Sequence, residues 1–345
     1  MRSREKNRKP IIGITMGDPA GVGPEIVLKS VLSREVREAF SASDMGFLII
    51  GDRRVLEETA KLTGADIELR SIHDTEELSV ISTEIPMWDT GFFRDTLKLP
   101  RAKVSPLGGE AAGLYIRDAV SLAKEGKIHG MVTAPLNKES LKQAGIPFAG
   151  HTEMLAALSE SDKSYTVFSV DKLNIFFHTR HLSLKEALNR VDTESIVKSI
   201  IDAEKCMHSI GYTNVKIALA ALNPHASNGG LFGEEERVIL EPACLKAEKM
   251  GMDVHGPIPA DSVFHLALNG EYDIVVSLYH DQGHIAAKTY DFYRTVSITF
   301  GLPFIRTSPD HGTAFDIAWK GVVNHLSMKE AILCCINLAR KYIPF

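Results

Sequence analysis

The stretch Ile11-Ile12-Gly13-Ile14-Thr15-Met16-Gly17-Asp18-Pro19-Ala20-Gly21-Val22-Gly23-Pro24-Glu25 gives the clearest indication of the fold class. Residues 11–16 predict a β-strand, and Pro24 suits the first position of a helix that follows the glycine-rich turn. The turn lets the backbone approach a ligand closely, while Asp18 and Glu25 add charge. A turn with a purely structural role is the competing interpretation. The sequence of this turn does not follow the pattern G-x-G-x-x-G, so the usual Rossmann dinucleotide fingerprint is absent.

The same alternation of apolar runs and amphipathic stretches continues along the chain. Further strands are expected at 47–50, 130–133, 166–170, 174–177, 215–221, 273–278 and 296–300. Helices are expected at 24–32, 109–125, 184–190, 193–210, 234–250 and 328–342, the last with Ser327 and Glu330 as a capping box. This pattern predicts an α/β fold with a largely parallel sheet, whose ligands bind at the carboxyl ends of strands.

Composition narrows the class of protein. A chain of 345 residues, 44% hydrophobic and 24% charged with a net charge of −5, predicts a globular protein of roughly two α/β lobes. Nothing in it favours nucleic acid or a membrane as a partner, and no apolar run approaches the ~20 residues that cross a bilayer. The four cysteines form no C-x-x-C pair, and the basic start lacks the apolar region of a secretory signal, so a reducing cytoplasm is expected.

Three histidines follow three separate predicted strands: His181, His225 and His280. If they converge, neutral imidazoles from separate loops suit Zn²⁺, Co²⁺ or Ni²⁺ better than Ca²⁺. The chain has thirteen histidines, however, and the spacing of these three is long. Three unrelated loop histidines with local hydrogen bonds are therefore an equally good interpretation of the pattern alone.

Several polar groups are candidates for binding an anion. Gly150-His151-Thr152-Glu153 predicts a helix start whose amides, with His151 and Thr152, suit a phosphate, although an N-cap role for Thr152 explains the same pattern. Lys138 ends the motif Thr133-Ala134-Pro135-Leu136-Asn137-Lys138, where solvation at the surface is the alternative. Lys288 and Arg306 are the best candidates for holding a phosphate or carboxylate. The alternative role of either residue is membership of a surface ion pair, which contributes under ~1 kcal/mol to stability.

Two carboxylates are candidates for proton transfer or for orienting an imidazole. Asp261 follows Pro257-Ile258-Pro259-Ala260, and Asp281 is the neighbour of His280. For Asp261, an N-cap of the following helix is the alternative role.

Six motifs, in this order over nearly the whole chain, resemble the 4-hydroxythreonine-4-phosphate dehydrogenase family of vitamin B6 biosynthesis. They are Gly-Asp-Pro-Ala-Gly-Val-Gly-Pro-Glu at 17–25, Thr-Ala-Pro-Leu-Asn-Lys at 133–138, Gly-His-Thr-Glu at 150–153, Asn-Pro-His at 223–225, Tyr-His-Asp-Gln-Gly at 279–283 and Gly-Leu-Pro-Phe-Ile-Arg-Thr-Ser at 301–308. More distantly, 311–321 looks like the nucleotide-binding loop of isopropylmalate and isocitrate dehydrogenases, whose fold the family shares.

The resemblance implies two α/β/α lobes with an active-site cleft between them. The first lobe would be 1–135 plus 297–345, with the cofactor loop, and the second 136–296, with the metal, substrate and dimer contacts. It also implies an NAD-dependent homodimer with one divalent ion per site, Zn²⁺ preferred and Co²⁺ or Mg²⁺ as alternatives.

The resemblance further implies the role of each site residue. His181, His225 and His280 would bind the metal, with His280 from the partner subunit, and the phosphorylated substrate would contact His151, Thr152, Lys288, Ser297 and Arg306. NAD would contact His311, Gly312, Asp316 and Asn324. Asp261, Asp281 and Lys138 are the candidates for proton transfer, and the sequence does not choose among them.

Departures from the family pattern concern the substrate. Ser297 stands where the biosynthetic enzymes usually carry asparagine, and Ser227-Asn228 replaces Gly-Glu, removing a carboxylate that favours a substrate ammonium. Gly283-His284-Ile285, Phe292-Tyr293 and Trp319 look like the subgroup acting on D-threonate or D-erythronate 4-phosphate. These features indicate a sugar-acid phosphate without an amino group.

The expected reaction is therefore NAD-dependent, metal-dependent oxidation at C3 of a four-carbon 4-phosphorylated 3-hydroxy acid, followed by loss of CO2 to give dihydroxyacetone phosphate. One alternative is 4-hydroxythreonine-4-phosphate, which would give 3-amino-2-oxopropyl phosphate. Another is a cis-dihydrodiol, and a third is a phosphoryl- or acyl-transfer enzyme, although no Walker A or G-x-S-x-G motif supports it.

Overall fold

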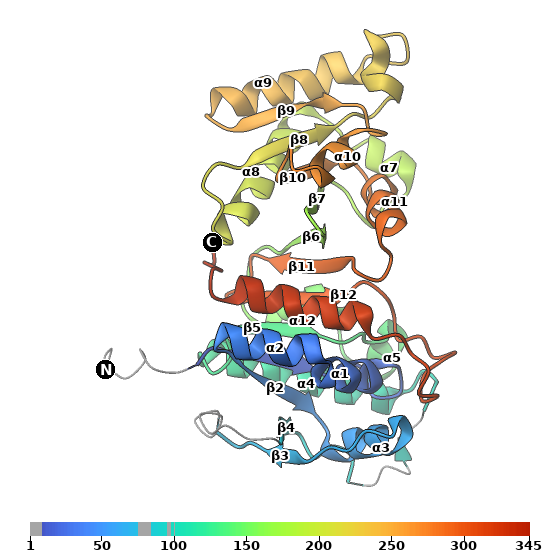
Figure 1. Ribbon diagram of the computed structural model, residues 1–345. Coiled ribbons are helices and arrows are strands. Elements are labelled where there is room, and N and C mark those ends of the chain that lie inside the picture. The colour runs from blue at the N-terminus through green and yellow to red at the C-terminus, as the bar shows by residue number, and fades with distance from the viewer. Residues whose placement is uncertain (1–8, 75–83, 95–97, 100) are drawn as a thin grey trace. The chain divides into compact units, whose positions relative to one another are not determined.

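A computed structural model describes residues 9–74, 84–94, 98–99 and 101–345 (Figure 1). The chain forms two compact units, the first made of Met1–Ser164 and Gly301–Pro344 and the second of Tyr165–Phe300 with Phe345. Residues 136–164, expected in the second lobe, belong to the first of these units. The functional division into lobes 1–135 plus 297–345 and 136–296 stays a prediction.

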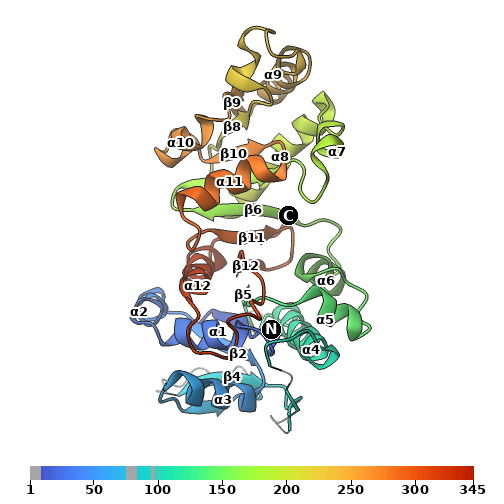
Figure 2. The ribbon, with the colours of Figure 1, turned by 90° about the vertical axis from the view of Figure 1, so that its right-hand side faces the viewer.

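The first unit is built on a parallel sheet. Its described strands follow the order β3 (Leu69–Ser71), β4 (Ile85–Asp89), β2 (Gly46–Gly51), β1 (Ile11–Thr15), β5 (Gly130–Thr133) and β12 (Ile305–Pro309). One face is covered by α1 (Gly23–Leu32), α2 (Arg34–Ser43), α3 (Arg53–Thr63) and α12 (Leu326–Ala339) (Figure 2). The other is covered by α4 (Pro106–Lys124), α5 (Lys138–Gln143) and α6 (His151–Leu158).

The second unit has a mixed sheet. Its described strands follow the order β11 (Val296–Phe300), β6 (Tyr165–Val170), β7 (Leu173–Phe177), β10 (Ile274–Ser277), β8 (Lys216–Ala220) and β9 (Asp253–Ile258). The strands from β7 to β9 are parallel, whereas β6 runs antiparallel to both β7 and β11. A two-residue turn with Asp171 at φ 52° joins β6 to β7 and accounts for the antiparallel pairing of these two strands. The helical segments are α7 (Leu184–Leu188), α8 (Thr193–Ser209), η4 (Pro224–Asn228), η5 (Glu236–Leu240), α9 (Glu241–Lys249), α10 (Val263–Leu268) and α11 (His280–Tyr290).

The turn after β1 shows why the chain needs its glycines there. Gly17 has φ 68°, and a Cβ on it would lie 2.3 Å from the carbonyl oxygen of Pro135. A Cβ on Gly23 would lie 2.0 Å from the carbonyl oxygen of Met16. Only glycine lets α1 start this close to the strand that it follows.

The α/β fold is confirmed, and each predicted strand is present. The sequence did not predict β3, β4, β9, β12, α2, α3, α5 or α11. The starts of α4 and α12 were also wrong, since α4 begins at Pro106 and not at 109. The last helix begins at Leu326 after His325, so Ser327 lies buried inside its first turn and does not form the expected capping box with Glu330. Among the described residues, no helix is long and apolar enough to cross a membrane.

Candidate functional site

Three adjacent parallel strands end at one edge of the second unit's sheet. β10 lies between β7 and β8, so the segments after these strands, which contain His280, His181 and His225, begin side by side. The ends of β7 and β10 are also joined directly, because His178 N donates to Ser277 O at 2.8 Å and Thr179 Oγ1 donates to Leu278 O at 2.8 Å. The fold therefore brings together the strand ends from which all three histidines were expected to converge.

His181 and His280 face the same cavity. Their ring centroids lie 5.9 Å apart, and both residues line a cavity of about 290 Å³ together with Arg180, Tyr279 and Asp281. The His280 Nδ1 lies 2.6 Å from Asp281 Oδ1. If Nδ1 holds the proton, it donates to this carboxylate and leaves Nε2 with a lone pair for a metal. Asp281 thus has the geometry of a residue that orients His280.

His225 lies in a backbone turn of unusual shape. Residues 225–227 have φ of 53°, 50° and 67°, which is the left-handed region that favours glycine. Glu236, buried at 1% exposure, secures the start of this turn, because its Oε1 accepts hydrogen bonds from the amides of Leu222 and Asn223. His225 is exposed on this strained turn, and its role as a metal ligand stays a prediction.

The side chains of His181, His225 and His280 fit a borderline divalent cation, because imidazole nitrogens suit Zn²⁺ or Co²⁺. Within the single chain, as far as it is described, no three His, Cys, Asp or Glu side chains lie close enough together to hold a metal ion. His181 and His280 are close, and His225 follows the neighbouring strand. The three-histidine set, including a contribution from a second subunit, stays a prediction.

Asp261 lies exposed before α10, where its Oδ1 accepts a hydrogen bond of 3.1 Å from Ser262 Oγ. The residue that precedes the helix is Ser262, so the alternative role of Asp261 as an N-cap is wrong. Its role in proton transfer stays a prediction.

In the first unit, a buried cation lies beside an unpartnered imidazole nitrogen. Arg306, on β12, is 5% exposed and donates from Nε and Nη2 to Thr133 Oγ1 at 3.0 and 2.6 Å. Burial lowers the pKa of Arg306 to about 10, although Asp310 opposes this. The Nε2 atom of His151 is buried and has no hydrogen-bond partner among the described residues. Burial, and then the charge of Arg306, hold the pKa of His151 well below its usual value.

These two groups fit an anion, because a buried guanidinium and an orphaned ring nitrogen both gain hydrogen bonds when a phosphate enters. His151 begins α6 and Gly150 is its N-cap, so the N-cap alternative for Thr152 is wrong. Lys138 is exposed at the start of α5, and a Cβ on Gly150 would lie 3.5 Å from its Cε. The Lys138 side chain therefore lies at the N-terminus of α6, near the same groups.

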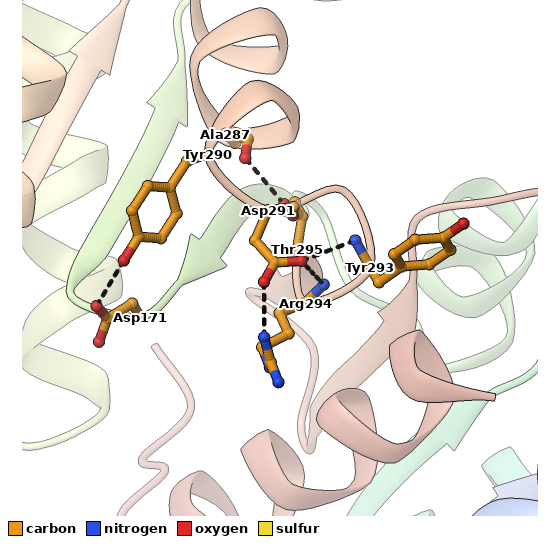
Figure 3. Close-up of polar contacts among 7 residues, drawn as sticks. All are labelled: Asp171, Ala287, Tyr290, Asp291, Tyr293, Arg294 and Thr295. Atoms are coloured by element: carbon orange, nitrogen blue, oxygen red, sulfur yellow. Dashed lines mark hydrogen bonds and ion pairs between the residues drawn. The ribbon is translucent and has the colours of Figure 1, made fainter. Parts of the chain in front are cut away.

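Lys288 and Ser297 belong to the second unit and lie on either side of a turn at residues 291–294. Figure 3 shows the polar contacts of this turn. Asp291 closes this turn: its Oδ1 accepts from the amides of Tyr293 and Arg294, both at 3.0 Å, and its Oδ2 accepts from Arg294 Nη1 at 2.9 Å. The Lys288 Nζ lies 5.2 Å from the centroid of the Phe292 ring, and Ser297 is half-buried on β11. The turn fixes the chain between these two expected substrate contacts.

The glycine-rich turn after β1 supports the expected cofactor loop. Val22 N donates to Thr313 O at 3.0 Å, and the indole of Trp319 donates to Pro19 O at 3.0 Å. The Glu25 carboxylate is buried and accepts hydrogen bonds from the loop. Asp18 is also buried, which raises its pKa, and it accepts from Ala20 N. The expectation that Asp18 and Glu25 charge a ligand-facing turn is therefore corrected, because both carboxylates face the protein.

The four expected cofactor contacts lie in or just after this loop. His311 Nδ1 lies 2.9 Å from Gly312 O, and Asp316 is exposed. Asn324 accepts a hydrogen bond from Leu326 N and lines a cavity of about 610 Å³ next to α1 and α12. Their contact with NAD stays a prediction.

Three structurally important residues were missed by sequence reasoning. Thr133 was quoted only as part of a motif, Gln282 was given no role, and His284 was noted only for its resemblance. The His284 ring stacks on His280 with centroids 3.5 Å apart and lies 4.2 Å from Phe168. Each of these residues acts through contacts between distant segments, for which the sequence has no local signal.

The chain was compared with known proteins. The family model described as "Pyridoxal phosphate biosynthetic protein PdxA" matches residues 44–335. A Clostridium botulinum protein named "Putative D-threonate 4-phosphate dehydrogenase" is 45% identical over 98% of both chains. The crystal structure of 4-hydroxythreonine-4-phosphate dehydrogenase from Klebsiella pneumoniae is 40% identical, with a TM-score of 0.85 over 96% of this chain and 100% of that one. A terephthalate 1,2-cis-dihydrodiol dehydrogenase from Burkholderia xenovorans is 26% identical, with a TM-score of 0.61 over 93% and 95%.

Proposed function

The chain belongs to the PdxA family and is a dehydrogenase, and we propose that it oxidises D-threonate or D-erythronate 4-phosphate with NAD. The product then loses CO2 to give dihydroxyacetone phosphate. The observation that supports this most directly is the buried Arg306 beside the buried Nε2 atom of His151. This nitrogen has no hydrogen-bond partner among the described residues and suits a phosphate oxygen. The identity of 45% to the Clostridium botulinum relative supports the same substrate class.

We assign substrate orientation to the residues that bind the phosphate. Arg306, His151 and the amides at the start of α6 hold the phosphate group, with Thr152 and Lys138 nearby. Binding energy from this remote group positions C3 for hydride transfer. Lys288 and Ser297, at the two ends of the Asp291 turn, are the further substrate contacts.

In the oxidation, C3 gives its hydride to NAD and its hydroxyl proton to a base, for which Asp261, Asp281 and Lys138 are the candidates. The bond between C1 and C2 then breaks, CO2 leaves, and C2 takes up a proton. A divalent ion held by His181, His225 and His280 would supply the positive charge that lowers the hydroxyl pKa and stabilises the enolate. His311, Gly312, Asp316 and Asn324 would hold the adenosine part of NAD.

The replacement of a carboxylate by Asn228 favours a substrate without an amino group. Ser227, which replaces glycine of the biosynthetic enzymes, is buried and donates its hydroxyl hydrogen to Gly233 O, while its Oγ accepts from Gly230 N. The side chain is thus used to shape the His225 turn. The neighbouring Asn228 is exposed and offers no negative charge for an ammonium.

Two alternatives keep the fold and change the substrate. 4-Hydroxythreonine-4-phosphate has the same phosphate but adds an amino group. A cis-dihydrodiol has support from the 26% identical relative. It has no phosphate, so the carboxylates of a terephthalate dihydrodiol would be the anionic groups for the buried Arg306.

A substrate panel tests the proposal. NADH formation is measured with D-threonate 4-phosphate, D-erythronate 4-phosphate, 4-hydroxythreonine-4-phosphate and a cis-dihydrodiol, each with NAD and with NADP and with added Zn²⁺, Co²⁺ or Mg²⁺. The proposal expects the highest kcat/KM with one of the first two substrates. A higher value for the amino substrate or the dihydrodiol would replace it with that alternative.

A further inference from the structure

We propose that Thr133 is a positioning residue for the substrate phosphate, because its hydroxyl fixes the buried guanidinium of Arg306. This inference rests on the proposed function, since it matters only if Arg306 binds a phosphate. Both residues belong to the first unit of one chain, so their geometry is the same at every site of an oligomer. Thr133 acts through Arg306 and does not itself touch the phosphate.

Two hydrogen bonds join this pair of residues. Arg306 donates from Nε at 3.0 Å and from Nη2 at 2.6 Å, and both bonds go to Thr133 Oγ1. Arg306 is 5% exposed, and Thr133 is completely buried. Because a hydroxyl oxygen has two lone pairs, Arg306 occupies the whole acceptor capacity of Thr133. One hydroxyl thus holds one edge of the planar guanidinium and decides where the rest of it points.

The position of the Thr133 hydroxyl is set by the sheet. β5 lies between β1 and β12, and it ends at Thr133. Arg306 is paired with Met131 on β5, so its side chain reaches two residues farther along that strand to Thr133 at the carboxyl end. Ligands of parallel sheets bind at this end. A β-branched side chain has few rotamers, so Oγ1 on this central strand is an acceptor with a fixed position.

The neighbouring strand shows that the Thr133 hydroxyl is directed at Arg306. Thr15 on β1 pairs with Thr133 in the register of the sheet. The Oγ1 atom of Thr15 is buried and has no hydrogen-bond partner among the described residues. The Thr133 hydroxyl therefore contacts the guanidinium from β12 and not the equivalent hydroxyl on β1.

The direction of the guanidinium matters for an anion. The charge of Arg306 acts on the buried ring of His151, whose Nε2 atom has no partner among the described residues. A phosphate that contacts both side chains needs the guanidinium in one orientation, because bidentate bonds to phosphate lie in its plane. Valine has the shape of threonine but no acceptor, so Thr133→Val would let the guanidinium turn away from that orientation.

The experiment measures the binding of inorganic phosphate to the full-length protein by isothermal titration calorimetry. The variants are Thr133→Val, which removes the hydroxyl, and Thr133→Ser, which keeps it. The matched control is Thr59→Val, because Thr59 is also completely buried but donates its hydroxyl hydrogen to Val55 O within α3, on the other face of the sheet (Figure 2). We expect Thr133→Val to weaken phosphate binding about 10- to 100-fold, the range for hydrogen bonds to a charged group. We expect Thr133→Ser and Thr59→Val to bind phosphate nearly as the unchanged protein does.

A double-mutant cycle separates positioning from direct contact. The quantity compared is kcat/KM for D-threonate 4-phosphate, which stays measurable when phosphate binding is weak. If Thr133 acts only through Arg306, Thr133→Val lowers this value in the unchanged protein but has no further effect once Arg306→Ala has removed the guanidinium. The KM for NAD should change little in each variant, whereas a general loosening of the fold would raise it as well.

The possible outcomes separate this inference from the proposed function. If the unchanged protein binds no inorganic phosphate, the phosphate site of the proposed function fails, and the inference fails with it. If the unchanged protein binds phosphate and Thr133→Val binds it equally well, or Thr133→Ser loses as much as Thr133→Val, the inference alone is overturned. A further loss from Thr133→Val in the Arg306→Ala background would mean that Thr133 contacts the phosphate itself, which also overturns it. If Thr133→Val lacks a cooperative thermal transition, Thr133→Ala takes its place in the same measurements.

Discussion

The carboxylate of Glu25 accepts the amide hydrogen of Trp319, with Glu25 Oε1 2.6 Å from Trp319 N. Its second oxygen accepts from Gly321 N at 2.9 Å, and the side chain is 1% exposed. A glutamate at the start of the chain thereby fixes a loop nearly three hundred residues later. Since that loop contains the expected cofactor contacts His311, Gly312 and Asp316, Glu25 links the first glycine-rich motif to the proposed NAD site.

Glu25→Ala is expected to loosen this loop. The change leaves two amide hydrogens without their acceptor, at a cost of about 1–3 kcal/mol each in the free energy of unfolding. We expect a raised KM for NAD as well as lower stability in urea unfolding. Glu38→Ala is the control, because Glu38 forms only an exposed ion pair with Arg34 and its loss costs under about 1 kcal/mol. Unchanged KM for NAD in Glu25→Ala would contradict the assigned role of the loop.

Arg306→Ala is expected to weaken substrate use far more than cofactor use. Loss of a charge-assisted contact worth about 1.5–3 kcal/mol lowers kcat/KM for the phosphorylated substrate by about 10- to 100-fold. The KM for NAD should change little. Arg340→Ala, which removes an exposed guanidinium at the end of α12, serves as the control. Equal losses for substrate and NAD would show that Arg306 supports the fold rather than the phosphate.

The depressed pKa of His151 predicts how stability depends on pH. Its ring stays neutral in the folded protein because burial and Arg306 disfavour the charged form, whereas in the unfolded chain it takes up a proton near its ordinary pKa of about 6.5. Below about pH 6.5 the unfolded state therefore binds more protons than the folded state. The contribution of the neutral His151 ring to the free energy of unfolding is fully present above about pH 6.5 and is lost as the pH falls.

His151→Gln should remove this part of the pH dependence. Urea unfolding at pH 7.5 and at pH 5.5 would show a smaller loss of stability in the variant than in the unchanged protein. The same loss in both proteins would mean that the folded state does not resist protonation of His151.

The sequence predicted much of the local structure and of the residue types at the site. The strands 130–133 and 296–300 match β5 and β11, because short runs rich in apolar and β-branched residues between turns have few alternatives. It did not predict α11, since His280, Gly283 and His284 interrupt any amphipathic pattern. The order of β7, β10 and β8 was also inaccessible, because strand order depends on packing between segments about a hundred residues apart. The role of Glu25 likewise depends on a contact between α1 and a loop nearly three hundred residues later in the chain, which no local pattern predicts.

A mixing experiment tests whether the proposed metal site is shared between two subunits. His225 is exposed and the His280 side chain is 38% exposed, so His225→Ala and His280→Ala should each abolish turnover with little loss of folded protein. If His280 comes from the partner subunit, a mixed dimer of the two variants has one intact site. Random exchange of subunits would then restore about a quarter of the sites, given the two-fold symmetry of a homodimer.

The control mixes His225→Ala with His181→Ala. These two histidines are proposed to come from the same subunit, so every site in the mixed dimer lacks one of them, and activity should not return. NADH formation is measured after partial unfolding and refolding of each mixture, with size-exclusion chromatography to establish that dimers have formed. Dimers of His225→Ala with His280→Ala that stay inactive would show that each chain supplies all three ligands to its own site.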